Sequence, residues 1–212
     1  MEQTDNIVAS AHVKFLAAIK RQVAEKFELW EDVLNSRDYG LPQARRRYYL
    51  VGRKRGGKRK FCVSVPLPKV LPPCTLPMIA LDDILNDDDG DVELPEDSVG
   101  LPNLIHCFKK MIKKGINPLE CHAICDVMGS NPTVSYGHFP TITRTRAGQT
   151  KAYFITHKLR WAKKEELMKA QGIIPQKLKF ACVLPNAVGR CVGNGVPVAV
   201  ARALFRSVLI MD

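Results

Sequence analysis

The sequence lacks any apolar run long enough to cross a membrane. Its longest apolar stretch, between Val196 and Met211, is interrupted by Arg202 and Arg206, whereas a transmembrane helix needs about 20 predominantly apolar residues. The N-terminus also lacks the charged-then-apolar order of a secretory signal. We therefore expect no membrane partner and no secretion.

Cysteine residues are few and form no regular framework. Their number, seven, is odd, and their spacing does not indicate a set of disulfides. Five potential zinc ligands lie between residues 106 and 125, but a tetrahedral zinc site usually shows two clearly separated ligand pairs, and one pair here would be an adjacent His-Cys. The sequence therefore predicts free thiols in a reducing compartment and no metal site. The ligands considered are His106, Cys107, Cys121, His122 and Cys125.

Negative charge is scarce outside one segment. The chain has 32 Lys and Arg residues against 21 Asp and Glu, a net charge of +11. Nine acidic residues fall within positions 82–97, which contain no Lys or Arg, and nine basic residues fall within positions 45–60. The rest of the chain is therefore more basic than the net charge of the whole chain indicates. This balance favours a polyanionic partner, nucleic acid before an anionic membrane surface, and a basic surface without a partner is the alternative.

The order of helical and extended patterns is that of an α/β domain with a different middle region. The middle contains a basic loop at 53–60, a proline-rich stretch at 61–80 and the acidic segment. We expect residues 1–53 to end an α/β domain, 54–138 to form a small inserted segment, and 139–212 to return to the α/β domain. Apolar spacing predicts helices at 6–28, 101–114, 163–170 and 197–209, and strands at 29–34, 47–52 and 152–156.

The most specific pattern lies at residues 38–52. Gln43, Arg45 and Arg47 alternate at the start of an expected strand, which places an amide and two guanidinium groups on one face. Such a face can hold an anion or the edge of a base bidentately, and three solvated arginines are the alternative. The run DYGLPQARR, followed by RYYLVG, resembles the eighth conserved motif of the cytosine-5 methyltransferase family. In that family the arginines contact the flipped-out cytosine and its backbone.

Two later segments resemble further motifs of the same family, in the family's order. Residues 138–144 and 160–173 are similar to the ninth motif, which organises the target-recognition domain. Residues 191–204 are similar to the tenth motif, which borders the S-adenosylmethionine pocket. From the residues alone, Gly193, Asn194 and Gly195 predict a tight turn into a helix whose N-terminal amides are free to bind. An ordinary turn that caps an apolar helix is the alternative.

A weaker resemblance lies at the start of the chain. Residues 2–7, EQTDNI, are similar to a degenerate form of the sixth motif, whose glutamate holds the cytosine ring nitrogen. Glu2 is the matching residue, and coincidence is the alternative for a match of one residue.

The sequence contains neither the glycine-rich first motif nor the Pro-Cys-Gln whose thiolate attacks cytosine C6. Cys74 follows two prolines, but it comes after the eighth motif and no glutamine follows it, so we reject it as the nucleophile. The resemblance therefore implies the C-terminal part of a Rossmann-like, S-adenosylmethionine-dependent methyltransferase domain with a small inserted target-recognition segment. The chain alone is expected to be inactive, and a separate chain is a candidate source of the N-terminal half.

The function that the resemblance implies is methyl transfer from S-adenosylmethionine to cytosine C5 in DNA, in the nucleus of a eukaryote or the cytoplasm or nucleoid of a prokaryote. A tRNA cytosine-5 methyltransferase and a non-catalytic DNA-binding remnant are the alternatives. The implied site residues are Arg45, Arg47 and Glu2 for catalysis, Asn194, Gly195 and Val196 for the cofactor, and Gln43, Arg46, Arg53, Arg144, Arg146 and Arg160 for DNA.

Overall fold

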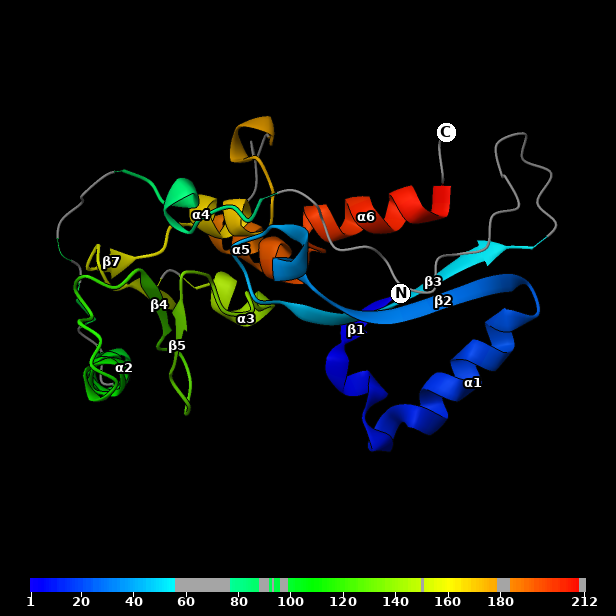
Figure 1. Ribbon diagram of the computed structural model, residues 1–212, viewed down its shortest axis with the longest axis horizontal. Coiled ribbons are helices and arrows are strands. Elements are labelled where there is room, and N and C mark those ends of the chain that lie inside the picture. Colours follow the sequence, from blue (N-terminus) through cyan, green and yellow to red (C-terminus); the bar gives the residue numbers. More distant parts are fainter. Residues whose placement is uncertain are drawn as a thin grey trace.

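The chain folds into two sheet-containing lobes joined side by side along one long axis (Figure 1). The computed structural model describes residues 1–55, 77–87, 92, 94–95, 99–149, 151–178 and 184–209. Cys74 and residues 56–60 of the expected basic loop lie outside these ranges, as do residues 88–91, 93, 96 and 97 of the acidic segment. Within these ranges, no helix has both the length and the apolarity needed to cross a bilayer.

The first lobe is built on a three-stranded antiparallel sheet of order β1-β3-β2. Side chains alternate along β3, so its two faces have separate partners. Tyr48 and Leu50 pack with Leu16 of α1, whereas Tyr49 packs with Val200 of α6 on the other face. The predicted strands at 29–34 and 47–52 are confirmed and extended. The elements are β1 (Glu2–Thr4), α1 (Val13–Ala24), β2 (Phe27–Asn35), β3 (Arg46–Lys54) and α6 (Val198–Leu209).

The first helix is shorter than the sequence predicts. Two 3-10 turns, Asp5–Val8 and Ser10–His12, precede α1 instead of a continuous helix, with Ala9 extended between them. The helix ends at Ala24, and Phe27 pairs with Lys54 at the end of the sheet. Phe27 and Glu28, which the helical spacing assigns to the helix, therefore belong to β2 and pair with β3.

The second lobe contains a four-stranded antiparallel sheet of order β5-β4-β6-β7. The expected helix at 101–114 is confirmed as α2, which packs Leu104 and Cys107 against Cys125 and Phe154 of the sheet. The boundary expected at 138–139 falls inside this sheet, since β4 and β5 precede it and β6 and β7 follow it. The three-part division of the chain stays a prediction. The elements are α2 (Gly100–Lys113), β4 (Ala123–Asp126), β5 (Thr133–Tyr136), β6 (Tyr153–Ile155) and β7 (Arg160–Trp161).

A helical layer joins the two lobes, and its α5 is not foreseen in the sequence. The tight turn predicted at residues 193–195 is wrong at its first two positions, because Gly193 and Asn194 are the last residues of α5. The chain turns at Gly195, which is extended, and α6 begins three residues later. The layer consists of α3 (Arg144–Ala147), α4 (Lys164–Ala170) and α5 (Pro185–Asn194).

Two glycines allow α5 to pack directly on the backbone around α3. A Cβ on Gly189 would lie 1.8 Å from the Ala147 carbonyl oxygen, and one on Gly193 would lie 2.4 Å from the Thr143 carbonyl carbon. Because four residues separate them, both glycines lie on the same face of the helix. Any larger residue at either position would push α5 away from α3.

A buried ion pair fixes α4 to β7. Arg160 Nη2 lies 2.7 Å from Glu166 Oε1, and both side chains are almost completely buried. Arg160 also donates to the carbonyl oxygen of Asn86, and Glu166 accepts from the backbone nitrogen of Asn86 at 2.8 Å. This pair therefore also fixes the segment that contains Asn86, and Arg160 lies inside the protein instead of at a DNA-binding surface.

We expect Gly193→Ala to lower the free energy of unfolding by about 3 kcal/mol, because its methyl group would overlap the Thr143 backbone. Gly195→Ala is the matched control, since its added Cβ would meet its nearest atoms at 3.4 Å, and it should cost less than about 1 kcal/mol. Urea unfolding of both variants measures the difference. Equal stability of the two variants would contradict the close packing of α5.

Removal of one partner of the Arg160–Glu166 pair leaves an uncompensated buried charge. Glu166→Leu should therefore cost about 3–5 kcal/mol of unfolding free energy. The double variant Arg160→Met with Glu166→Leu replaces both charges with apolar groups and should recover most of that loss. A double variant as unstable as the single one would show that the pair is not the source of the effect.

Candidate active site

The three predicted catalytic residues meet where β1 lies beside β3. Glu2 pairs with Tyr49 across the sheet, so its carboxylate projects from the same face as the alternate residues of the neighbouring strand. Glu2 Oε1 lies 3.5 Å from Arg45 Nη2 and 4.0 Å from Arg47 Nε. The structure thus brings one carboxylate between two guanidinium groups.

Arg45 is the anchored member of this cluster. Its side chain is only 4% exposed, and its Nη1 donates to the carbonyl oxygens of Ile142 at 2.8 Å and Gly193 at 3.2 Å. A guanidinium that is held by two carbonyls and a carboxylate has little surface left for a ligand. Arg45 therefore orients Glu2 and connects the sheet to the end of α5.

Arg47 and Tyr49 complete the face around Glu2. Burial and the nearby Arg45 lower the pKa of Arg47, and Glu2 opposes that shift; an arginine in a protein nevertheless stays protonated. The Tyr49 hydroxyl lies 3.5 Å from Glu2 Oε1, and burial and then Glu2 raise the pKa of Tyr49. At neutral pH the phenol is therefore protonated and donates to the carboxylate. Tyr49 is not among the residues predicted from the sequence, although the alternation of residues 45, 47 and 49 places it on this face.

A cavity of about 380 Å³ opens beside Glu2, between the sheet and α6. Its lining includes Glu2 and Tyr49 from the sheet and Val196, Leu204 and Phe205 from the C-terminal segment. Val196 is the predicted cofactor residue that reaches this cavity, while Asn194 is exposed and Gly195 half-buried just before it. The lining is mostly apolar, and its polar groups include the Tyr49 hydroxyl and the Glu2 carboxylate. Such a lining is suited to an uncharged ring system such as the adenine of S-adenosylmethionine.

Three of the predicted DNA-binding residues lie apart from this cluster. Gln43 is completely buried, with its amide nitrogen 3.5 Å from the Ala170 carbonyl oxygen. Arg46 is exposed, but it projects from the opposite face of the sheet, toward Asp5 at 3.8 Å. Arg53 donates to Glu28 at 3.1 Å, and it lies about 20 Å along β3 from Arg47. The adjacency of these residues in sequence does not bring them onto one surface.

The predicted DNA-binding residues of the second lobe also differ in placement. Arg146 lies 2.8 Å from the carboxylate of Asp126, whose pKa is raised by burial although Arg146 opposes that shift. Arg160 is buried against Glu166. Arg144, at the start of α3, instead lines a second cavity.

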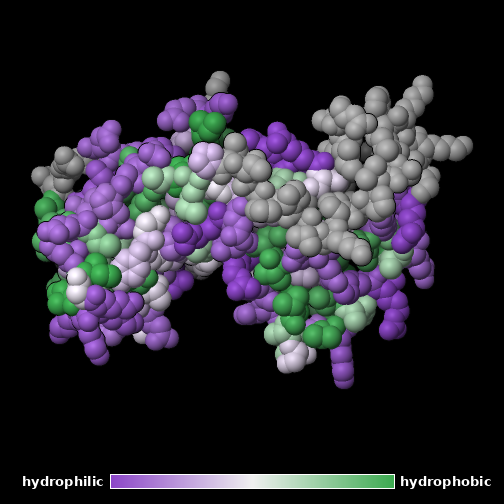
Figure 2. Space-filling model, in the orientation of Figure 1, coloured by the Kyte–Doolittle hydropathy of each residue, from purple (hydrophilic) through white to green (hydrophobic). Residues whose placement is uncertain are grey.

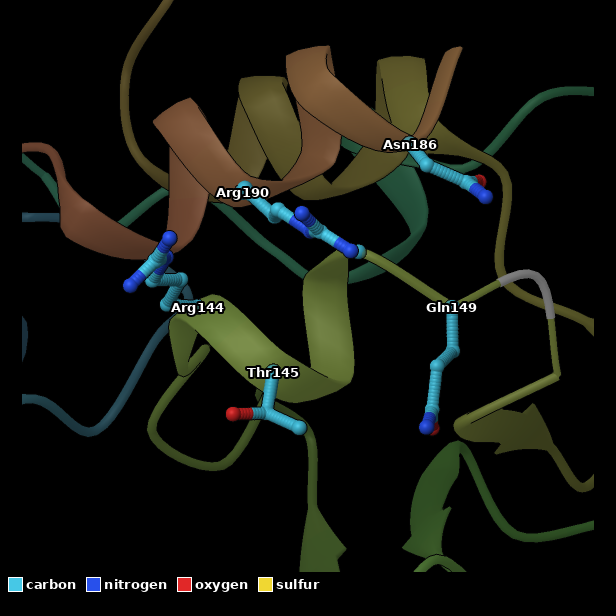
Figure 3. A pocket seen from close by; sticks show the side chains of 6 residues that line it. Arg144, Thr145, Gln149, Asn186 and Arg190 are labelled. Carbon is cyan, nitrogen blue, oxygen red and sulfur yellow. The ribbon is translucent and has the colours of Figure 1, made fainter.

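This second cavity, about 460 Å³, lies between α3 and α5 and is lined by polar side chains (Figure 3). Arg144 comes from α3 and Arg190 from α5, and Asn186 and Gln149 also reach it (Figure 3). Two guanidinium groups without a carboxylate in this lining favour an anion such as a phosphate. Arg190 is not among the residues predicted from the sequence, because Arg144, which lines the same cavity, lies more than forty positions away on another helix.

Several solved structures share the fold of this chain, and their descriptions name methyltransferases. A prophage protein of E. coli, described as a DNA modification methyltransferase, is 16% identical with a TM-score of 0.62, over 100% of this chain and 69% of that one. EhMeth of Entamoeba histolytica is 14% identical with a TM-score of 0.58, over 100% and 62%. A DNMT2 variant of Spodoptera frugiperda is 15% identical with a TM-score of 0.60, over 98% and 65%. These similarities show the fold and confirm the expected α/β methyltransferase class.

The chain spans 62% of the length of EhMeth, so the fold of these proteins extends beyond the segment present here. No curated protein matches the sequence. A family model described as C-5 cytosine-specific DNA methylase matches residues 1–209. The chain therefore belongs to the C-5 cytosine-specific DNA methylase family.

Proposed function

We propose that this chain holds the target base in an enzyme that transfers a methyl group from S-adenosylmethionine to C5 of cytosine in DNA. The observation that carries the proposal is the placement of Glu2 beside Arg45, Arg47 and Tyr49, next to a cavity that Val196 also lines. A DNA substrate implies a place in the nucleus or nucleoid.

The charges of this cluster match the polar edge of cytosine. A carboxylate accepts from the exocyclic amino group of cytosine, and Glu2 presents one that is 18% exposed. Arg47, 14% exposed, donates to the carbonyl oxygen of the base and stabilises negative charge that develops on the ring. Arg45 and Tyr49 hold Glu2 in position. Because these groups lie inside the protein, the base must leave the duplex to reach them.

The cofactor would lie against Val196, with Asn194 and Gly195 at the border of its pocket. S-adenosylmethionine supplies the methyl group when it is bound. The apolar side chains of Val196, Leu204 and Phe205 line one side of the cavity beside Glu2, and an apolar surround strengthens the electrostatic interactions of the cluster with a bound base.

The remaining parts of the site would come from a segment outside this chain. In the described residues β1 pairs with β3 alone, so its other edge is open to a further strand. Apolar groups flank this edge on both faces of the sheet. Phe205 is exposed on the α6 side, and Val8, Val13 and Phe15 are exposed on the α1 side, where Figure 2 shows hydrophobic groups gathered. This surface fits the N-terminal half of a catalytic domain, which would bring the nucleophilic cysteine and the glycine-rich motif.

DNA phosphates would be held at the cavity between α3 and α5. Arg144 and Arg190 line it, and Lys164 Nζ lies 3.2 Å from the Asn186 side chain at its rim. Phosphate contacts position a duplex without reading its sequence.

Glu2→Gln should lower the rate constant of methyl transfer by about 100-fold or more, because the amide is a weaker acceptor and cannot hold a proton for the ring. The assay uses the completed enzyme, in which this chain is combined with a segment that carries the glycine-rich motif and Pro-Cys-Gln. Labelled S-adenosylmethionine is supplied with DNA and, separately, with tRNA. Glu25→Gln on the exposed end of α1 is the matched control and should keep full activity.

Loss of activity in Glu2→Gln with unchanged unfolding free energy supports the proposed role. Equal activity of Glu2→Gln and Glu25→Gln would contradict it. Transfer to tRNA in place of DNA would contradict the DNA substrate, and no transfer by the completed wild-type enzyme would indicate the non-catalytic DNA-binding remnant.

The double variant Arg144→Ala with Arg190→Ala should reduce the salt dependence of DNA binding. If each guanidinium neutralises one phosphate, the slope of log K against log salt concentration falls in magnitude by about 2. Fluorescence anisotropy with one duplex at several salt concentrations measures this slope. Lys14→Ala with Arg21→Ala on α1 removes the same charge elsewhere, so an equal fall in that control would refute a localised phosphate site.

A further inference from the structure

Three side chains from separate segments converge at one end of β4 and β6, the inner strands of the four-stranded sheet, apart from the proposed base site. Asp82 begins the 3-10 turn η4 (Asp82–Ile84), His122 directly precedes β4, and His157 follows β6. One potential metal-ligand atom of each residue lies within 4.8 Å of the other two. Neither the base site nor the phosphate cavity uses these residues.

The two imidazoles share one carboxylate. Asp82 Oδ2 lies 2.5 Å from His122 Nδ1, and Asp82 Oδ1 lies 3.4 Å from His157 Nε2. The two rings are stacked, with centroids 4.2 Å apart and planes at 14°. Each carboxylate oxygen therefore faces a different ring, and the ring nitrogens point toward the same small volume.

His157 is the more buried of the two histidines. Its side chain is 14% exposed, against 51% for His122, and its Nε2 faces Asp82 Oδ1 at 3.4 Å. Its Nδ1 is buried without a hydrogen-bond partner among the described residues, so Nε2 is the ring nitrogen that can reach an ion held by Asp82.

We propose that Asp82, His122 and His157 bind a divalent transition-metal ion, with Zn²⁺ as the representative ion. Two imidazole nitrogens and one carboxylate oxygen are a common ligand set for zinc. Metal–ligand bonds of about 2.0–2.2 Å in a tetrahedral site place the ligand atoms about 3.4 Å apart. The Asp82–His157 distance already has that value. His122 and Asp82 are about half exposed, so both can shift by the small amount that the remaining distances require.

The ion would fasten the segment around Asp82 to the sheet. Leu81, Ile84 and Leu85 of this segment are buried in the core beneath α4 and α5. A metal ion would join that segment to both β4 and β6 by bonds stronger than the present hydrogen bonds. Three protein ligands leave a fourth coordination position open to solvent, as in sites that bind water or an exchangeable ligand.

Thermal unfolding and calorimetry of the untagged protein with ZnCl₂ test the proposal. We expect saturable binding of one equivalent of zinc and an increase in Tm with zinc concentration. At a free zinc concentration 100 times the dissociation constant, the unfolding equilibrium shifts by about 100-fold. MgCl₂ at the same concentration should bind at least tenfold more weakly, because Mg²⁺ prefers oxygen ligands.

His122→Ala and Asp82→Asn should each weaken zinc binding by at least about tenfold, and both residues are exposed enough for the fold to tolerate the change. His106→Ala on α2 is the matched histidine control, and Cys121→Ser removes the thiol adjacent to His122. Both controls should bind zinc as the wild type does. Cobalt(II) provides an independent readout, because its visible absorption reports a low-symmetry nitrogen and oxygen site.

No saturable zinc binding by the wild-type protein would overturn the proposal. Unchanged affinity in His122→Ala and Asp82→Asn, or loss of binding in Cys121→Ser, would place the ion elsewhere and overturn it too. Methyl-transfer activity is not part of this test, so its outcome is independent of the proposed function.

Discussion

The buried guanidinium of Arg45 connects the parts of the chain that form the candidate active site. It joins Glu2 on the first strand to the carbonyl oxygens of Ile142 and Gly193. These two residues lie 97 and 148 positions after Arg45 in the sequence. Loss of this group would leave two carbonyls and a carboxylate without their shared donor, a large cost inside a protein. The position of Glu2, and with it any role in holding a base, therefore depends on contacts made by the C-terminal half of the chain.

The packing of α5 places one of those carbonyls where Arg45 can reach it. Gly189 and Gly193 let the helix lie directly on the backbone of residues 143–148. The same helix provides Arg190 to the polar cavity, and its last residue is Asn194, next to the predicted cofactor segment. One close helix contact thus links the proposed base, phosphate and cofactor positions, and this explains why they adjoin although they come from distant parts of the sequence.

Regular elements with clear periodicity could be predicted from the sequence, and contacts between distant segments could not. Helices α2, α4 and α6 and strands β2 and β3 follow from apolar spacing. The short strand β1 has three residues and β4 is buried throughout, so neither shows alternation. Gln43 and Arg160 are polar residues of types that usually lie at the surface, yet both are buried. Gln43 donates to the carbonyl oxygen of Ala170, and Arg160 donates to the carboxylate of Glu166. The cluster of Asp82, His122 and His157 also escapes sequence analysis, because Asp82 lies 40 residues before His122.

In the proposed function, Glu2 and Arg47 hold a cytosine that has left the DNA duplex. The most direct measurement is a structure of the completed enzyme on DNA that contains 5-fluorocytosine, because fluorine at C5 blocks the final elimination and retains the base in the site. We expect to find the exocyclic amino group within hydrogen-bond distance of the Glu2 carboxylate and the carbonyl oxygen of the base beside Arg47. A trapped base that contacts neither residue would contradict this proposed role.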